Sequence, residues 1–481
     1  MQTETIAAIA TAMSDSGIGI IRISGEDSIS IAEKIYRSKL NNKKLSQVKS
    51  HTIHYGFIYD EDELLDEVMV AVMKAPNSYT TENTVEINCH GGILIMNRIL
   101  EAVMKNGARL AEPGEFTKRA FLNGRIDLSK AEAVMDVIRS KNEFALKSSV
   151  SQLKGAVYEK IKKLRQEIIY EIAFIESALD DPEHISTEGY NEKLSVKIKA
   201  LTDEIFKLIS SSDNGKMLKE GINTVIVGKP NAGKSSLLNL LVGEEKAIVT
   251  DIAGTTRDIL EETIKLHGIG LNVIDTAGIR STEDRVEKIG VEKAKKYAAD
   301  ADLIVYVVDS SVDFDESDEE IITLIKNKNA IILLNKTDLD PVVTEEYLNK
   351  KLDGIEKNHL TVTNDDSLKN EDHHGNYKII KTSTKENTGI DVFEDTVKDM
   401  FFYNELQCND QVFITNMRHK EALQNAYNSL LMVKKSLEDD MPEDFYSIDL
   451  MSAYASLGTI IGEEVGEDLV NEIFSKFCMG K

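Results

Sequence analysis

Cysteine, proline and tryptophan are scarce in this chain of 481 residues, which contains three, six and none of them respectively. Cys89, Cys408 and Cys478 are too few and too scattered to predict a disulfide framework or a zinc site. The low proline content, together with 29% charged residues, favours a helix-rich cytosolic protein. No run of about 18 apolar residues occurs, so we expect no membrane span.

Targeting signals and an excess of positive charge are also missing. The N-terminal stretch MQTETIAAIATAMSDSG lacks the basic segment of a signal peptide and the arginines of a transit peptide, which predicts a cytoplasmic protein. A net charge of −25 argues against a broad electrostatic grip on nucleic acid. A protein of this charge that serves RNA would need a local basic patch or a partner that carries the RNA. Alternatively, the charge only keeps the protein soluble.

A phosphate-binding motif is the strongest local signal in the chain. The stretch TVIVGKPNAGKSSLLN predicts a buried strand, and Gly228 to Ser235 then fit G-x-x-x-x-G-K-[ST]. The two glycines let backbone N–H groups face a phosphate, Lys234 supplies positive charge, and Ser235 offers a hydroxyl to Mg²⁺. Taken alone, the stretch could be an ordinary glycine-rich turn. The expected nucleotide contacts are Asn231, Ala232, Gly233, Lys234, Ser235 and Ser236.

Three further motifs follow in the order expected of a guanine-nucleotide switch domain. They are Asp275, Thr276, Ala277 and Gly278, then Asn335, Lys336, Thr337 and Asp338, then Ser383, Thr384 and Lys385. The first two motifs follow apolar runs, so they should lie at strand ends. There the Asp275 carboxylate can reach the Mg²⁺ shell, and the Gly278 N–H can meet a γ-phosphate.

Asp338 is the residue of these motifs that can select the base, because it carries a carboxylate. It can accept hydrogen bonds from both the N1–H and the N2 amino group of guanine, a pair that adenine does not offer. Ser383 to Lys385 would support the base from its other side. The four motifs together therefore predict a GTP-binding domain and exclude a preference for ATP.

The regions around these motifs predict a multidomain α+β and α/β protein of roughly three domains. Long helices are expected up to residue 212, where Asp213-Asn-Gly215 should end them with a turn, and again over 405–436 and 449–477. The simplest topology is a discontinuous helical bundle interrupted by an inserted P-loop GTPase (Ras-like) domain. The expected divisions are an N-terminal domain (1–121), two helical parts (122–220 and 403–481) and a G domain (221–402).

A polar segment at 364–376, NDDSLKNEDHHGN, separates two of the motifs and is interpreted as a mobile surface insertion. The adjacent His373 and His374 could suggest a metal site. No ligand spacing surrounds them, so a solvated loop is the favoured interpretation.

Motifs in all three regions resemble one known family. They are APNSYT (75–80), VEI (85–87) with HGG (90–92), EPGEFT (112–117), RAFLN (119–123), TDIAGTTRD (250–258) and FCMGK (477–481). With them the chain resembles the tRNA-modification GTPase MnmE (TrmE) family over essentially its whole length. The resemblance implies an N-terminal domain that binds a tetrahydrofolate derivative and mediates homodimerisation.

The resemblance also implies site residues outside the G domain. It places folate contacts at Arg22, Glu86, Arg125 and Lys481. From the pattern alone, Arg22 could equally be a surface residue at a strand end. Cys478 occupies the cysteine position of the terminal motif, where it is either a small buried residue or a functional thiol.

Water activation needs a separate source, because Ile279 and Arg280 follow the second motif where many GTPases carry a glutamine. The resemblance assigns this role to Glu287, beside Lys234 as the second catalytic residue. Without the resemblance, Glu287 would be interpreted as a surface carboxylate of a helix. Mg²⁺ would be held by Ser235 and by Thr256 of the switch loop.

An arginine finger is likewise not found, and the resemblance implies K⁺ in its place when two G domains meet. Its ligands would be the side chain of Asn231 and backbone carbonyls of Thr250, Ile252 and Thr255. Without the resemblance, Asn231 could simply stabilise the loop. The whole switch loop is expected to contact GTP: Thr250, Asp251, Ile252, Ala253, Gly254, Thr255 and Thr256.

The implied function is that of a GTP-hydrolysing subunit in tRNA modification. The complex adds a carboxymethylaminomethyl or aminomethyl group at C5 of the wobble uridine of certain tRNAs. A folate one-carbon unit (5-formyl- or methylene-tetrahydrofolate) is implied as the source, in a heterotetramer with the FAD-containing protein MnmG (GidA). The alternative class is a regulatory GTPase that binds ribosomes or assembly factors, which would have no need of the flanking motifs.

Overall fold

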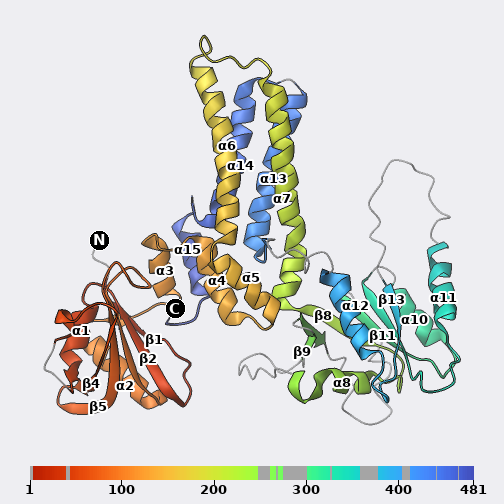
Figure 1. Cartoon of the computed structure of the whole chain (residues 1–481), viewed down its shortest axis with the longest axis horizontal. Helices are drawn as coiled ribbons and strands as arrows, with labels where there is room; N and C mark the ends of the chain where they lie inside the picture. Colours follow the sequence, from red (N-terminus) through yellow and green to blue (C-terminus); the bar gives the residue numbers. More distant parts are fainter. Residues whose placement is uncertain are drawn as a thin grey trace. The chain divides into compact units, whose positions relative to one another are not determined.

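The computed structural model of the protein describes residues 4–39, 44–246, 261–266, 269–274, 301–325, 328–357, 377–402, 412–439, 441–463 and 465–480. The chain divides into two compact units (Figure 1). One unit comprises Met1–Arg139, Ser149–Phe206 and Arg418–Lys481, and the other comprises Ser140–Ser148 and Lys207–Met417. Within the described ranges, no helix is both long and apolar enough to cross a membrane.

The first unit begins with a seven-stranded sheet in the order β3-β4-β5-β6-β2-β1-β7. All neighbouring strands are antiparallel except β1 and β7, which are parallel. The strands are β1 (Ile6–Ile9), β2 (Ser16–Ser24), β3 (Tyr36–Ser38), β4 (Thr52–Asp60), β5 (Glu63–Met73), β6 (Thr84–Gly91) and β7 (Arg109–Leu110). The accompanying helices are α1 (Ser28–Ile35), a short 3₁₀ turn (Leu45–Gln47), α2 (Ile93–Lys105) and α3 (Glu115–Leu122).

Both faces of this sheet bury apolar side chains, because alternate residues of a strand point to opposite faces. On one face, Ile21 and Ile23 of β2 pack in a cluster with α1 and α2. Alternate residues of β1, Ile6 and Ala8, join a smaller cluster with Phe116 of α3. The adjacent strands β1, β2 and β6 are therefore packed on both faces, and β2 and β6 carry side chains discussed below.

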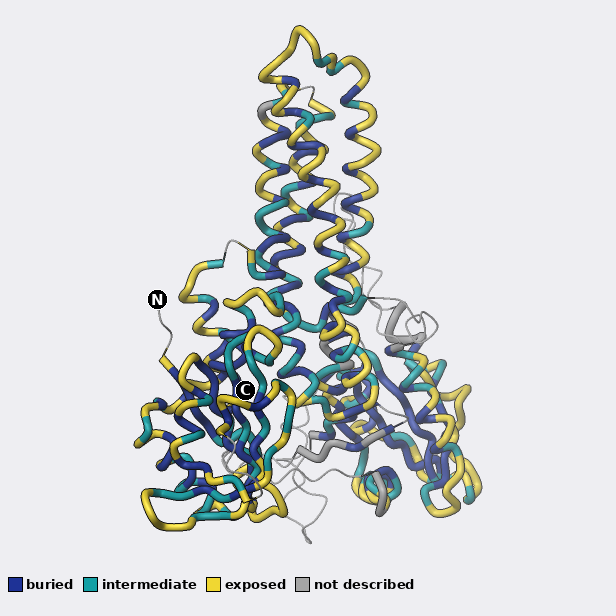
Figure 2. The backbone as a smooth tube through the Cα atoms, turned by 60° about the vertical axis from the view of Figure 1, so that its left-hand side comes forward, coloured by how far each residue is buried: buried dark blue, intermediate teal, exposed yellow. Residues whose placement is uncertain are grey.

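A helical bundle completes the first unit. Its helices are α4 (Leu128–Arg139), α5 (Glu143–Leu153), α6 (Ala156–Asp180), α7 (Tyr190–Glu220), α13 (Met417–Glu438), α14 (Glu443–Ile461) and α15 (Glu467–Ser475), of which α5, α7 and α13 extend across the division between the units. Along the long helices, buried positions recur every three or four residues, as Figure 2 shows. Polar contacts also join neighbours: Tyr190 donates to Glu171 of α6, and Ser447 of α14 donates to Glu176.

Within the bundle, a largely buried ion cluster joins residues that are distant in the sequence. Glu132 of α4 accepts hydrogen bonds from Arg418 Nη2 at 2.7 Å, and its Oε2 lies 2.8 Å from Nε2 of the buried His419. Arg418 Nη2 also donates to the Ile460 carbonyl near the end of α14. Burial raises the pKa of Glu132, but the neighbouring His419 and Arg418 charges outweigh it and lower that pKa to about 2.

Two predicted helix boundaries are wrong, and one predicted helix is divided in two. The turn expected at 213–215 does not form, and α7 continues to Glu220. Gly215 instead allows a close approach, because a Cβ there would lie 2.3 Å from the Ile414 carbonyl oxygen. The helix ends at Gly221, whose left-handed φ of 91° is a common way to terminate a helix.

The second wrong boundary concerns the helix predicted from residue 405. Residues 412–416 are not helical, and α13 begins at Met417. The helix predicted over 449–477 is also divided, because Gly462 adopts φ 89° after α14. Its missing Cβ leaves room for Phe121 and Leu128, so packing selects glycine there and ends the helix.

The second unit contains a six-stranded sheet in the order β13-β12-β11-β8-β10-β9. All its neighbouring strands are parallel except β9, which is antiparallel to β10. The strands are β8 (Ile222–Val227), β9 (Glu261–Leu266), β10 (Ile269–Ile274), β11 (Leu303–Asp309), β12 (Ala330–Asn335) and β13 (Tyr377–Lys381). The helices are α8 (Lys234–Lys246), α10 (Glu316–Ile325), α11 (Glu345–Lys357) and α12 (Ile390–Phe402).

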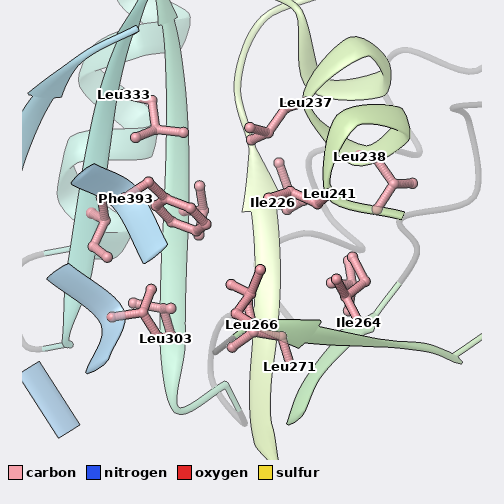
Figure 3. Close-up of a cluster of buried hydrophobic side chains, with 14 of the residues drawn as sticks. Ile226, Leu237, Leu238, Leu241, Ile264, Leu266, Leu271, Leu303, Leu333 and Phe393 are labelled. Carbon is pink, nitrogen blue, oxygen red and sulfur yellow. The ribbon is translucent and has the colours of Figure 1, made fainter. Parts of the chain in front are cut away.

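This sheet is buried on both faces, as a parallel sheet requires. One apolar cluster joins α8 and α12 to the strands, and Figure 3 shows Ile226, Leu241 and Phe393 among its members. A second cluster packs the alternate residues of β8, β11 and β12 against α10 and α11. The predicted fold class is confirmed: a multidomain α+β and α/β protein with a discontinuous helical bundle and an inserted P-loop GTPase domain.

Candidate functional site

The loop between β8 and α8 adopts the backbone that phosphate binding needs. Gly228, Asn231 and Gly233 have φ values of 151°, 60° and 104°. A Cβ at Gly228 would lie 2.3 Å from the Val307 carbonyl oxygen, so only glycine fits against β11. Positive φ values with ordinary residues between them are typical of loops that turn N–H groups toward an anion, and here the loop leads into the start of α8.

Lys234 lies inside this loop at the first position of α8. Its Nζ donates to the carbonyl oxygens of Gly228 and Lys229, both at 2.7 Å. Burial lowers the pKa of the Lys234 ammonium. The side chain therefore braces both ends of the loop, and its charge lies where phosphate oxygens would bind. Ser235 and Ser236 follow it and are exposed.

Asn335, the last residue of β12, ties three predicted motifs together. Its side chain is fully buried. Nδ2 donates to the Ala232 carbonyl at 2.8 Å, and Oδ1 accepts from the Thr384 N–H at 3.0 Å. The phosphate loop must also remain small there, because a Cβ at Gly233 would lie 2.1 Å from Nδ2.

Asp338 lies beside the last motif, as a base reader should. Its Oδ1 accepts a hydrogen bond from Ser383 Oγ at 2.8 Å, and its Oδ2 lies 3.7 Å from Lys385 Nζ. The Ser383 hydrogen bond and the Lys385 charge lower the pKa of Asp338, so the group is a carboxylate at neutral pH. Thr337 holds the turn, since its N–H and hydroxyl both donate to the Thr382 carbonyl.

In the first unit, a second group of predicted residues converges beside the paired strands β2 and β6. Arg22 of β2 donates to Glu86 of β6 at 2.8 Å and to the Gly480 carbonyl at 3.1 Å, and its side chain is only 16% exposed. The guanidinium of Arg125 lies over the Tyr79 ring at 4.5 Å, and that of Arg22 lies 5.8 Å from the same ring. Two cations, one carboxylate and an aromatic ring thus meet beside the C-terminal segment.

Comparison with known proteins decides the family. A model described as "MnmE helical domain" matches residues 128–478, and one described as "GTP-binding protein TrmE N-terminus" matches residues 5–125. The chain is 56% identical to the tRNA modification GTPase MnmE of Lachnoclostridium phytofermentans over 100% of both chains. The chain belongs to the MnmE family of tRNA-modification GTPases.

Other relatives agree with this assignment. The MnmE proteins of Acetivibrio thermocellus and Clostridioides difficile are each 46% identical to this chain, over 99% of this chain and of each relative. Among solved structures, an Era variant from Aquifex aeolicus bound to GDP and AlF4⁻ is 27% identical, covering 44% of this chain and 67% of that chain at a TM-score of 0.26. As a member of the MnmE family, the protein is a GTPase.

Several predicted residues lie outside the described ranges. They are the switch loop from Thr250 to Thr256, the motif from Asp275 to Gly278, Glu287 and Lys481. Their roles in this MnmE-family protein remain predictions. The histidine pair in the 364–376 segment lies outside the described residues too.

Cys478 is exposed, so it does not serve as a small buried residue. Its carbonyl accepts a hydrogen bond from the Gly114 N–H at 3.3 Å, which holds the C-terminal segment against the start of α3. The functional-thiol interpretation stays a prediction.

Sequence reasoning missed several residues beside these sites. Tyr79 was recognised only as part of a family motif, although its ring faces two predicted folate-binding cations. It also missed Lys229, whose Nζ contacts two carboxylates of α10 and the segment before it. Nothing in the local pattern around Lys229 indicates these partners, which follow it by more than 80 residues.

Proposed function

We propose that the described G-domain motifs form one GTP site and that the protein hydrolyses GTP there with Mg²⁺. The observation that carries the proposal is the buried Asn335 side chain, which joins the phosphate loop at Ala232 to the base loop at Thr384. Lys234 would neutralise the β–γ phosphate oxygens. The Asp338 carboxylate would accept the two hydrogen bonds that identify guanine.

The proposed catalytic residues include Ser235, which the structure describes, and Thr256 and Glu287, which lie outside the described ranges. The residues present fit Mg²⁺, because the Ser235 hydroxyl follows Lys234 at the start of α8 and is exposed. Bound Mg²⁺ would supply charge neutralisation between the β- and γ-phosphates. We further propose Thr256 as the second hydroxyl ligand and Glu287 as the residue that orients water.

K⁺ stimulation on G-domain dimerisation is the second part of this proposal. Asn231 is exposed in the phosphate loop, where its backbone adopts φ 60°. With the backbone carbonyls of Thr250, Ile252 and Thr255, it would form an oxygen-rich site for a monovalent cation. Such a cation would offset charge that develops during phosphoryl transfer.

For the remainder of the chain, we propose a role in modifying C5 of the wobble uridine of certain tRNAs in the cytoplasm. Support comes from the relatives' names and from the convergence of Arg22, Glu86, Arg125 and Tyr79. A carboxylate suits the N–H donors of a pterin, cations suit a glutamate tail, and an aromatic ring suits stacking. Lys481 would add a further cation to this folate site.

The assembly proposed for this activity is a homodimer that joins the FAD-containing protein MnmG (GidA) in a heterotetramer. We propose the domain division 1–121, 122–220, 221–402 and 403–481 for each subunit. The match of residues 5–125 to the TrmE N-terminal model favours modification over a purely regulatory GTPase. Deletion of the gene should remove the C5 group from wobble uridines, whereas unchanged tRNA would favour the regulatory function.

The base-reading role is tested by Asp338→Asn. The asparagine amide can donate to the O2 of xanthine, so the variant should lose GTP affinity and gain affinity for xanthosine triphosphate. Binding of both nucleotides would be measured for wild type and variant by competition with fluorescent GDP. A variant that keeps its preference for guanine would show that Asp338 does not read the base.

A further inference from the structure

The stretch from the last residue of β11 to the first turn of α10 (309–318) binds one lysine of the phosphate loop and one lysine of the base motif. At its start, Asp309 Oδ2 lies 2.5 Å from Nζ of Lys336, which belongs to the base motif. At its end, Asp318 Oδ2 lies 2.7 Å from Nζ of Lys229, the second residue of the phosphate loop. Asp315 Oδ2 lies 3.0 Å from the same ammonium. One short acidic segment therefore contacts two loops that are distant in sequence.

The carboxylates of this segment are themselves fixed. Asp318 is 1% exposed, and its second oxygen accepts a hydrogen bond of 2.7 Å from the hydroxyl of the fully buried Tyr306. The Asp315 N–H donates to Asp318 Oδ2 at 3.0 Å. Lys229 is therefore paired with a buried carboxylate in the first turn of α10, which Tyr306 of β11 holds in place.

The Lys229 backbone is equally involved in the phosphate site. Its carbonyl accepts the hydrogen bond from Lys234 Nζ at 2.7 Å, and its Nζ also donates to the Asp313 carbonyl at 3.0 Å. The Lys229 ammonium thus binds the acidic segment, while the Lys229 carbonyl orients Lys234, the phosphate-binding lysine. Burial opposes the charge on Lys229, but the hydrogen bonds to Asp318 and Asp315 outweigh it and raise its pKa.

We propose that Lys229 is a positioning residue for GTP: clamped by Asp315 and Asp318, it fixes the phosphate loop against the segment that also anchors Lys336. The clamp sets the spacing between the phosphate and base subsites without touching the nucleotide. This inference rests on the proposed GTP site. The clamp differs from an ordinary surface ion pair, which stabilises a protein little and would not change ligand affinity.

Three variants of the full-length protein test the clamp. Lys229→Met removes the charge and keeps the length of the side chain, and Lys229→Arg restores a cation that can pair with two carboxylates. Lys351→Met is the matched control, because Lys351 pairs with Glu319 of α10 at 2.6 Å and, among the residues that the structure describes, contacts no nucleotide motif. Affinity and dissociation rate would be measured with fluorescent GDP and Mg²⁺, and thermal stability without nucleotide.

Lys229→Met should bind GDP roughly tenfold more weakly through faster dissociation, since groups in one hydrogen-bonded network couple strongly. Lys229→Arg should recover most of that loss, and Lys351→Met should bind as wild type does. If Lys229→Met does not fold, Asp315→Asn replaces it with the same direction of effect, because Asp315 is half exposed and lies outside the core.

Equal GDP affinity of a folded Lys229→Met variant and wild type would overturn the inference. So would an equal loss in Lys351→Met, which would indicate a general effect of removing a lysine. Failure of the wild type itself to bind guanine nucleotides would instead refute the proposed function. The two outcomes are therefore distinguishable in one titration series.

Discussion

Replacing Asn335 with alanine should separate the phosphate loop from the base loop. The side chain is fully buried and has partners on both loops: the Ala232 carbonyl at 2.8 Å and the Thr384 N–H at 3.0 Å. A third hydrogen bond, from Nδ2 to Thr384 Oγ1, is longer at 3.3 Å. Truncation removes all three and leaves two backbone groups without their partner.

The magnitude follows from these lost contacts. A buried donor or acceptor left unsatisfied costs about 1–3 kcal/mol, and the two backbone groups together give about 2–4 kcal/mol after partial relaxation. Because both loops contact the nucleotide, part of this cost should appear in binding and part in the free energy of unfolding. A loss of about 1.4–3 kcal/mol in binding corresponds to roughly tenfold to hundredfold weaker GDP affinity.

The assay is a titration of fluorescent GDP, with thermal unfolding of the same samples. Thr384→Val is the matched control, since it removes only the hydroxyl contact at 3.3 Å and keeps the backbone N–H bond to Asn335. It should weaken binding by less than about threefold, because a single hydrogen bond contributes modestly. Wild-type GDP affinity in Asn335→Ala would refute the view that this side chain organises the site.

Three other perturbations have definite expected outcomes. Glu132→Gln should lower the free energy of unfolding at pH 7 by about 3 kcal/mol, the value of a pKa that drops from 4.5 to about 2 on folding. A lowered carboxyl pKa stabilises the protein fully above the unfolded pKa, and this stabilisation is lost as the pH falls toward the folded pKa. The difference from wild type should therefore shrink from pH 4.5 toward pH 2 in denaturant titrations; a gap independent of pH would contradict this. Asn231→Ala should abolish any excess of the GTPase rate in K⁺ over Na⁺ at equal ionic strength, and equal wild-type rates in both salts would remove the basis for a K⁺ site. Arg22→Met should weaken calorimetric binding of 5-formyl-tetrahydrofolate at least about tenfold because a charge-assisted contact is lost, whereas the exposed Arg37→Met should not; similar losses in both would indicate a nonspecific effect.

The nucleotide motifs could be predicted from sequence because their chemistry is contiguous. A short stretch specifies both the backbone conformation and the spacing on which the phosphate loop depends, as Gly228, Gly233 and Lys234 show. The partner of Lys229 could not be predicted in this way. Asp315 and Asp318 follow β11, and they lie near Lys229 only because β8 and β11 are neighbours in the sheet.

Helix boundaries failed where tertiary packing overrode a local signal. Asp213-Asn-Gly215 has the composition of a turn, but the residues lie inside helix α7. Gly215 is needed there because the Ile414 backbone approaches it closely. For the proposed folate site of the first unit, sequence reasoning named Arg22 and Glu86 but not Tyr79. An aromatic ring within a polar motif carries no periodicity, so its place against two cations emerges only from the fold.

The hydrogen bond between Arg22 and the Gly480 carbonyl has a consequence for the order of synthesis. The two residues are separated by 458 positions, so the N-terminal sheet can fold on the ribosome long before its last partner exists. Nascent chains would carry an Arg22 guanidinium that still awaits one acceptor. A polypeptide interrupted between the GTPase domain and Gly480 would therefore lack this contact at the proposed folate site, even where its GTPase domain is already complete.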